Sequence, residues 1–130
     1  MAETLPRPVK VFLVEDSALI RARVTELLQA AAMTVVGYAR TPEAAIDGIL
    51  AARPEVVVLD VQLDGGVGLQ VLRAVRRAAP GIAFVVFSGN SGPAYRRLYL
   101  GAGADSFLDK STQSDQLVPA VLRASDHVHV

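Results

Sequence analysis

Three short apolar runs in this chain each end in side chains that can do chemistry. The runs and their polar ends are residues 11–14 before Glu15 and Asp16, residues 56–59 before Asp60, and residues 82–87 before Ser88. Runs that are this short and this rich in β-branched residues are typical of strands buried on both faces of a parallel sheet. Because the carboxyl ends of such strands line the ligand crevice, we expect these polar side chains to meet at one edge of the sheet.

Three of these four side chains are carboxylates, which repel one another when they share a site. Glu15, Asp16 and Asp60 could not all stay ionised at close range unless a cation compensated their charge. Mg²⁺ suits such a place, because proteins hold it with one or two carboxylates together with waters and phosphate oxygens. The pattern therefore predicts a magnesium site at this edge of the sheet.

The composition excludes several classes of protein. With 130 residues, of which 52% are hydrophobic, the chain is long enough for one domain with one full core. Its 13 basic and 13 acidic residues balance, so we expect no nucleic-acid partner. No apolar run approaches the roughly 18 residues of a membrane span, and residues 1–9 do not resemble a signal peptide. We therefore expect no membrane partner and a cytoplasmic location.

Strand-like and helix-like patterns alternate about every dozen residues, which is the signature of repeated βαβ units. The expected strands are residues 11–14, 33–38, 55–60, 82–88 and 104–109. The expected helices are an apolar stripe over residues 19–28, followed by residues 42–53, 68–79, 93–102 and 112–124, with a loop at Gly65 and Gly66. Thr41 and Pro42 provide the start signals of the second helix. Pro119 predicts a kink in the last helix or a late start of it.

This order of elements predicts an α/β fold, in which a doubly wound, five-stranded parallel sheet forms a (βα)5 three-layer sandwich. Right-handed crossovers place helices on both faces of the sheet. A flavodoxin-like strand order of 2-1-3-4-5 brings the ends of the first and third strands together at the topological switch point. We expect a single domain over residues 1–130, with its core at about 9–124 and a frayed tail from Ser125 to Val130.

Together these residues resemble the receiver domains of two-component response regulators, and the resemblance runs from Val9 to Leu122. The matching positions are the acid pair Glu15-Asp16, Asp60 after the third strand, Ser88 after the fourth, Phe107, and Lys110 after the fifth. Residues 102–110 are also similar to the fifth-strand signature of the family. Each residue alone has an ordinary structural explanation, such as a helix cap or a strand-end turn. All five roles at the right spacings form a specific pattern.

The resemblance implies a phosphoacceptor receiver of a two-component phosphorelay, similar to the chemotaxis-type single-domain receivers. Asp60 would accept a phosphoryl group from a sensor histidine kinase or a histidine phosphotransfer protein. Lys110 and Ser88 would contact phosphoryl oxygens. Such a domain is not an enzyme in the usual sense, because it catalyses only its own phosphorylation and dephosphorylation.

The resemblance also implies the metal ligands. Glu15, Asp16 and Asp60, together with the backbone carbonyl of Gln62, would hold Mg²⁺ or Mn²⁺. Asp64 lies close by in the sequence, but its neighbours Gly65 and Gly66 favour a role in the loop over one as a ligand.

The same resemblance implies a switch that a downstream effector protein reads. Phosphorylation would draw Ser88 inward and turn Phe107 from an outward to an inward rotamer. The surface of the fourth helix, fifth strand and fifth helix would change with it; in this sequence it comprises Tyr95, Arg96, Arg97, Tyr99 and residues 113–117. Ser111 stands where many receivers carry a proline, which leaves the geometry of that loop open.

Other interpretations agree less well with the residues. A haloacid-dehalogenase-like phosphatase needs a second aspartate where Gln62 stands, and a flavodoxin-like FMN protein would not place Glu15 and Asp16 against a phosphate. A degenerate receiver that acts only as a binding module disagrees with the presence of residues for all five roles. The alternative that stays open is the N-terminal receiver fragment of a DNA-binding transcriptional regulator. The ending at residues 126–130, which holds both histidines, favours a stand-alone receiver with a flexible tail.

Overall fold

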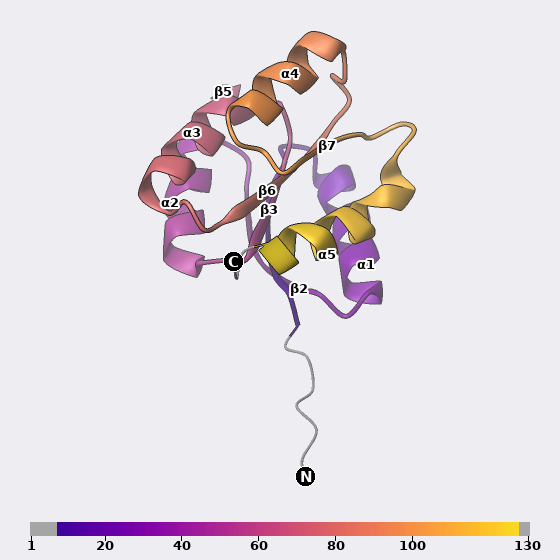
Figure 1. Cartoon of the computed structure of the whole chain (residues 1–130). Coiled ribbons are helices and arrows are strands. Elements are labelled where there is room, and N and C mark those ends of the chain that lie inside the picture. Colours follow the sequence, from indigo (N-terminus) through magenta and orange to yellow (C-terminus); the bar gives the residue numbers. More distant parts are fainter. Residues whose placement is uncertain (1–7, 128–130) are drawn as a thin grey trace.

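Five parallel strands form the centre of the computed structural model, which describes residues 8–127 (Figure 1). The strands are β1 (Lys10–Val14), β2 (Thr34–Ala39), β3 (Val56–Leu59), β6 (Ala83–Ser88) and β7 (Ser106–Asp109). Their order is β2-β1-β3-β6-β7, and each neighbouring pair is parallel. Counted along the chain, this is the order 2-1-3-4-5, so the predicted flavodoxin-like sheet is confirmed.

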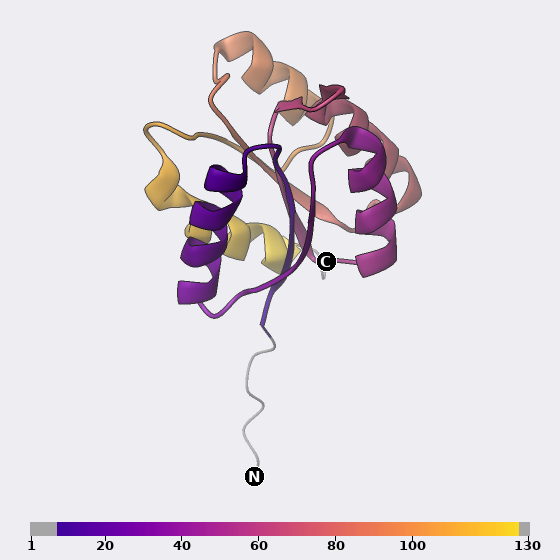
Figure 2. The same cartoon turned by 180° about the vertical axis from the view of Figure 1, so that it is seen from behind.

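Helices cover both faces of this sheet, as Figures 1 and 2 show from opposite sides. They are α1 (Ala18–Ala30), α2 (Pro42–Ala52), α3 (Gly68–Ala78), α4 (Pro93–Gly101) and α5 (Leu117–His127). Helices α1 and α5 pack on one face, whereas α2, α3 and α4 lie on the other. None of the helices within residues 8–127 has the length and apolar character that a membrane crossing requires.

The core consists of two layers because successive strand residues point to opposite faces of a sheet. In β7, Phe107 belongs to the layer under α2, α3 and α4, and Leu108 belongs to the layer under α1 and α5. Phe84 and Val85 of β6 divide between the two layers in the same way. Strands buried on both sides explain the unbroken apolar runs in the sequence.

Capping residues fix the ends of α2 as the sequence predicts. The Thr41 hydroxyl accepts a hydrogen bond of 3.2 Å from the Ala44 backbone N–H, and Pro42 occupies the first turn. Arg53 ends the helix in the left-handed conformation with φ of 53°, and Pro54 follows it. The helix therefore stops where strand β3 must begin.

The last helix starts later and ends later than its apolar pattern suggests. A single 3-10 turn, Ser114–Gln116, precedes α5, so Pro119 lies in the first turn, where a missing N–H is tolerated. The late start is therefore confirmed. The prediction of a frayed tail is wrong for residues 125–127, because the helix continues through His127 and Ser125 is buried. The rest of that tail lies outside the described residues.

A small hairpin replaces the loop predicted after β3. Strands β4 (Gln62–Leu63) and β5 (Gly66–Val67) pair in antiparallel fashion. The turn between them is Asp64-Gly65, and Gly65 takes a φ of 75° that glycine adopts without strain. An Asp-Gly pair is a known hairpin signal, so the sequence did contain the information. This hairpin begins two residues after Asp60.

Candidate functional site

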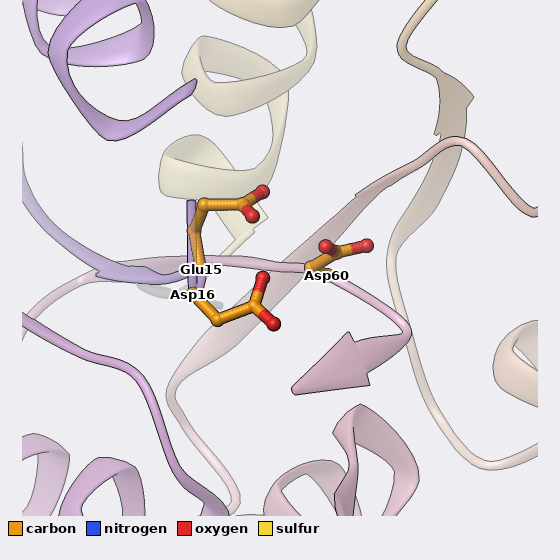
Figure 3. A group of neighbouring side chains, drawn as sticks. All are labelled: Glu15, Asp16 and Asp60. Carbon is orange, nitrogen blue, oxygen red and sulfur yellow. The ribbon is translucent and has the colours of Figure 1, made fainter. Parts of the chain in front are cut away.

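Three carboxylates converge where β1 and β3 end (Figure 3). Glu15 and Asp16 follow β1, Asp60 follows β3, and these two strands are neighbours in the sheet. One carboxylate oxygen from each residue lies within 4.8 Å of the others. Glu15 and Asp60 are buried, whereas Asp16 is partly exposed. The structure therefore brings together the three acids that the sequence singled out.

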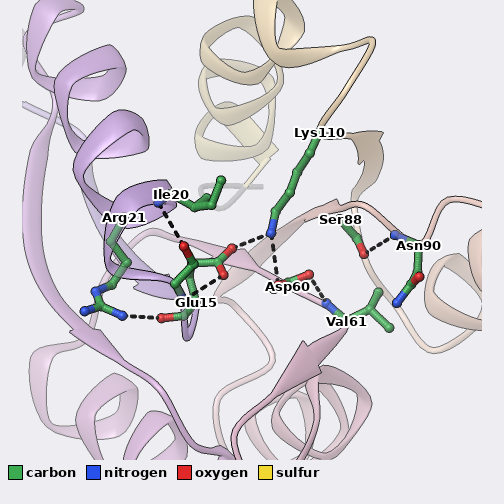
Figure 4. Close-up of polar contacts among 9 residues, drawn as sticks. Glu15, Ile20, Arg21, Asp60, Val61, Ser88, Asn90 and Lys110 are labelled. Carbon is green, nitrogen blue, oxygen red and sulfur yellow. Dashed lines mark hydrogen bonds and ion pairs between the residues drawn. The ribbon is translucent and has the colours of Figure 1, made fainter.

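The backbone around the acids is fixed by continuation of the sheet. The Asp60 N–H donates to the Val14 carbonyl at 3.0 Å, and the Glu15 N–H donates to the Ala39 carbonyl at 3.0 Å. The Arg21 guanidinium in α1 donates to the Glu15 carbonyl at 2.8 Å (Figure 4). The backbone hydrogen bonding of the sheet thus extends to the first residue after β1 and to the first residue after β3.

Lys110, which follows β7, reaches across to two of the acids (Figure 4). Its Nζ lies 2.6 Å from Glu15 Oε1 and 3.0 Å from Asp60 Oδ2. Burial alone would lower the pKa of Lys110, but the two carboxylates outweigh burial and raise it. Burial raises the pKa of Glu15, with a further contribution from the Asp60 charge, and the hydrogen bond from Lys110 opposes the rise. One ammonium group facing three carboxylates leaves the cluster with a net negative charge.

The second oxygen of Asp60 is held by the chain that follows it. Asp60 Oδ1 accepts a hydrogen bond of 2.7 Å from the Val61 N–H. Gly68, the first residue of α3, donates its N–H to the Val61 carbonyl at 2.7 Å, and a Cβ there would overlap the Asp60 carbonyl oxygen. Gln62 lies next to this segment with an exposed side chain. Its proposed role as a carbonyl ligand stays a prediction.

Ser88 and Phe107 occupy the interior beside the site. Ser88 ends β6, is fully buried, and accepts a hydrogen bond of 3.0 Å from the Asn90 N–H through its hydroxyl oxygen (Figure 4). The Phe107 ring points inward and packs edge-on against Tyr99, with ring centroids 6.0 Å apart. The aromatic ring predicted to switch is therefore inward in this structure.

The predicted partner surface needs a correction at two places. Tyr99 is 2% exposed and Leu117 is fully buried, so neither can contact a partner directly. Burial raises the pKa of Tyr99, and the Tyr99 hydroxyl accepts a hydrogen bond of 3.0 Å from the Leu69 N–H in α3. Tyr95 and Arg96 are exposed as predicted. The sequence placed Tyr99 on α4 correctly, but it could not show which face of that helix packs against the core.

Asp109 is a residue near the site that the sequence reasoning missed. Its carboxylate accepts hydrogen bonds from the Ser91 hydroxyl, from the Ser111 N–H at 2.7 Å and from the Thr112 N–H at 3.1 Å. These bonds, of which the one from Ser91 is the largest cause, lower the pKa of Asp109. Asp109 therefore ties the loop after β6 to the loop after β7, directly beside Lys110. An aspartate whose carboxylate accepts a hydrogen bond from the N–H two residues further on forms an Asx-turn, and aspartate in a loop is a sequence signal for it.

The comparisons with known proteins agree with this geometry. The sequence model described as "Response regulator receiver domain" matches residues 11–122. The chain is 36% identical over 113 residues to a protein-glutamate methylesterase/protein-glutamine glutaminase of Moorella thermoacetica, covering 85% of this chain. It is 32% identical over 114 residues to the DNA-binding transcriptional activator DevR/DosR of Mycobacterium tuberculosis, covering 87% of this chain.

A solved structure of similar sequence has the same fold. The signal receiver domain of NarL from Mycobacterium tuberculosis superimposes with a TM-score of 0.87 at 33% identity, covering 93% of this chain and 98% of that one. The curated relatives are longer proteins, because this chain spans 26% of the methylesterase and 52% of the activator. The similarity therefore concerns a domain that these proteins share.

Proposed function

Because this chain belongs to the response regulator receiver domain family, we propose that it accepts a phosphoryl group on Asp60. The donor is a phosphohistidine of a sensor histidine kinase or a histidine phosphotransfer protein. The observation that carries the proposal is the meeting of Glu15, Asp16 and Asp60 within 4.8 Å, with the Lys110 ammonium 3.0 Å from Asp60. The proposal includes a cytoplasmic location, where such a kinase presents its phosphohistidine.

The acids fit a divalent metal ion such as Mg²⁺ or Mn²⁺. All the candidate ligands are oxygens, as hard cations require, and Lys110 alone does not neutralise three carboxylates. Glu15, Asp16 and Asp60 would hold the ion together with the backbone carbonyl of Gln62. A bound ion would supply charge neutralisation for an anionic phosphoryl group that approaches an anionic nucleophile.

The reaction then depends on how the chain's own residues meet the phosphoryl group. An Asp60 oxygen attacks the phosphorus in line, a new O–P bond forms, and the N–P bond of the phosphohistidine breaks with its electron pair going to the imidazole. Lys110 turns from the Asp60 carboxylate to a phosphoryl oxygen, and the Ser88 hydroxyl donates to another. Positioning and charge stabilisation provide most of the catalysis in such transfers. Water later hydrolyses the acyl phosphate and restores the Asp60 carboxylate.

The proposed output is a change in the surface of α4, β7 and α5. A groove of about 380 Å³ lies there, and Phe107, Arg96 and Arg123 are among the residues that line it. The Arg96 guanidinium donates to the Phe107 carbonyl at 2.8 Å, so a movement of β7 would reach the surface directly. A downstream effector protein would read this surface, and beyond the transfer to itself the chain would catalyse no reaction.

A second form of the same function is the receiver part of a DNA-binding regulator. The similarity to the DevR/DosR activator, of which this chain spans 52%, favours that alternative. In that case the effector would be a domain of the same polypeptide, and DNA would be bound by that domain rather than by residues 8–127.

Phosphorylation with a small donor tests the proposal. Incubation with acetyl phosphate and Mg²⁺ should add one phosphoryl group, which hydroxylamine removes because it cleaves acyl phosphates. Asp60→Asn should abolish the modification. Asp64→Asn is the matched control, since Asp64 is an exposed carboxylate paired with Arg40 at 2.9 Å. A phosphoryl group on the Asp60→Asn variant, or one on Ser88, would contradict the assignment.

A further inference from the structure

The helices α3 and α4 carry an unbalanced positive charge. Residues 65–104 contain five arginines and no aspartate or glutamate, although the whole chain has 13 acidic and 13 basic residues. Four of these arginines (Arg73, Arg76, Arg77 and Arg97) line one groove of about 530 Å³ between the two helices. The remaining lining residues are Leu98, Gly101 and Ala102, so the lining is apolar apart from the arginines and contains no acid.

Only one of the four arginines is used to hold the fold together. The Arg76 guanidinium donates to the Gly103 carbonyl at 2.7 Å, to the carbonyls of Pro80 and Ile82, and to Asp105 at 3.1 Å. Arg76 therefore links α3 to the segment just before β6 and to the segment after α4.

The other three arginines, Arg73, Arg77 and Arg97, are exposed. Within residues 8–127 they make no hydrogen bond and no ion pair. Like charges gathered in one groove raise the energy of the free protein, and an anionic partner removes that cost. Arginine is also the cation that best matches carboxylates, because its planar fork can donate two parallel hydrogen bonds.

The walls of the groove are fixed before anything binds. At one end the Tyr99 hydroxyl of α4 accepts a hydrogen bond of 3.0 Å from the Leu69 N–H of α3. At the other end Arg76 of α3 binds the Gly103 carbonyl just after α4. A preformed groove loses little conformational entropy when a partner enters it.

We propose that the α3–α4 groove binds an acidic peptide segment of a partner protein, with an apolar side chain of that segment packed on Leu98. Leu98 is 45% exposed at the groove, and its neighbours Gly101 and Ala102 leave room for a peptide backbone. A single-stranded nucleic acid is less suited, because such sites pair basic residues with aromatic stacking platforms and no aromatic residue lines this groove. The groove shares α4, including Arg97, with the predicted effector surface, but no residue of β7 or α5 lines it. Because its walls are already in place, its occupation needs no phosphoryl group on Asp60.

The test measures binding of a short fluorescein-labelled peptide that repeats Glu-Glu-Leu-Glu, followed by anisotropy with the whole protein. The peptide should bind, and the double variant Arg73→Glu, Arg97→Glu should weaken binding by at least about tenfold, since close interfacial charge pairs contribute strongly. Amide shifts in an NMR titration should concentrate on α3 and α4. The control Arg23→Glu, which makes the same charge change at an exposed position of α1, should leave the affinity within about twofold.

Several outcomes would overturn the groove proposal. One is that the peptide does not bind at all, or that a peptide with glutamine in place of glutamate binds equally well. Another is that the Arg23→Glu variant weakens binding as much as the double variant does. A third is that the protein binds oligothymidylate or anionic vesicles more tightly than the peptide. The Asp60→Asn variant should bind the peptide as the wild type does. A failure of the proposed phosphorylation at Asp60 can therefore be distinguished from a failure of the proposed peptide binding in the groove.

Discussion

Replacing Lys110 with methionine tests the electrostatics of the acid cluster in depth. The substitution keeps a long side chain but removes the Nζ that lies 2.6 Å from Glu15 and 3.0 Å from Asp60. Two unit charges at 4.8 Å repel by about 3.5 kcal/mol at an effective dielectric constant of about 20. Breaking a buried ion pair typically costs about 3–5 kcal/mol. Because Lys110 is still 18% exposed, we expect a loss of about 3 kcal/mol in the unfolding free energy of the metal-free protein.

A double-mutant cycle separates this electrostatic loss from lost packing. In the Asp60→Asn background Lys110 pairs with Glu15 only, so Lys110→Met should then cost about half as much, a coupling energy of about 1.5 kcal/mol. Urea unfolding in EDTA, followed by circular dichroism, measures all four proteins. Lys10→Met is the control, because Lys10 is the chain's other lysine and is exposed. The reasoning would be refuted if Lys110→Met lowered the unfolding free energy equally in the wild-type and Asp60→Asn backgrounds. It would also be refuted if the loss in the wild-type background were below about 0.5 kcal/mol.

Three further predictions concern neighbouring residues. Asp16→Asn should raise the unfolding free energy of the metal-free protein by up to about 1 kcal/mol, since it removes a repelling charge. Mg²⁺ should stabilise this variant less than it stabilises the wild type. Urea unfolding with and without Mg²⁺ checks both expectations. Gly68→Ala should lower the melting temperature, because the new Cβ meets the Asp60 carbonyl, whereas Gly81→Ala, where a Cβ meets nothing within 4 Å, serves as its control. Hydrogen bonding lowers the pKa of Asp109 below its ordinary 3.8, so the stability it adds is present above 3.8 and is lost as the pH falls through the lowered folded value. The Asp109→Asn variant should accordingly be less stable than the wild type at pH 6, and urea unfolding at decreasing pH should show the difference shrink once the pH falls below 3.8.

The sequence predicted the sheet well because each strand carries its own signal. Five apolar runs alternate with helical patterns, and right-handed crossovers then allow few topologies. Positions at strand ends are equally well determined, which is why the acids and Lys110 were placed correctly. A side chain that directly follows a strand has little freedom in where it goes.

Other features depend on which way a side chain turns, and the sequence does not show this. Tyr99 was assigned to the surface of α4, but it lies inside and joins α4 to α3. Arg76 and Arg77 are neighbours of the same type, yet only Arg76 donates to the Gly103 carbonyl after α4. The difference arises from helix rotation by 100° per residue, which no composition or spacing argument resolves to one residue.

The alternation of faces along β7 restricts how the length of this chain can change. Phe107 belongs to one core layer and Leu108 to the other, and only two residues later Lys110 must reach Glu15 and Asp60. Inserting or deleting one residue in this strand would exchange the two layers and turn the lysine away from the acids. The hairpin turn at Asp64-Gly65 carries no such demand, because both residues are exposed and neither belongs to a core layer. Natural insertions, or an engineered tag, should therefore be tolerated at that turn and selected against from β7 up to Lys110.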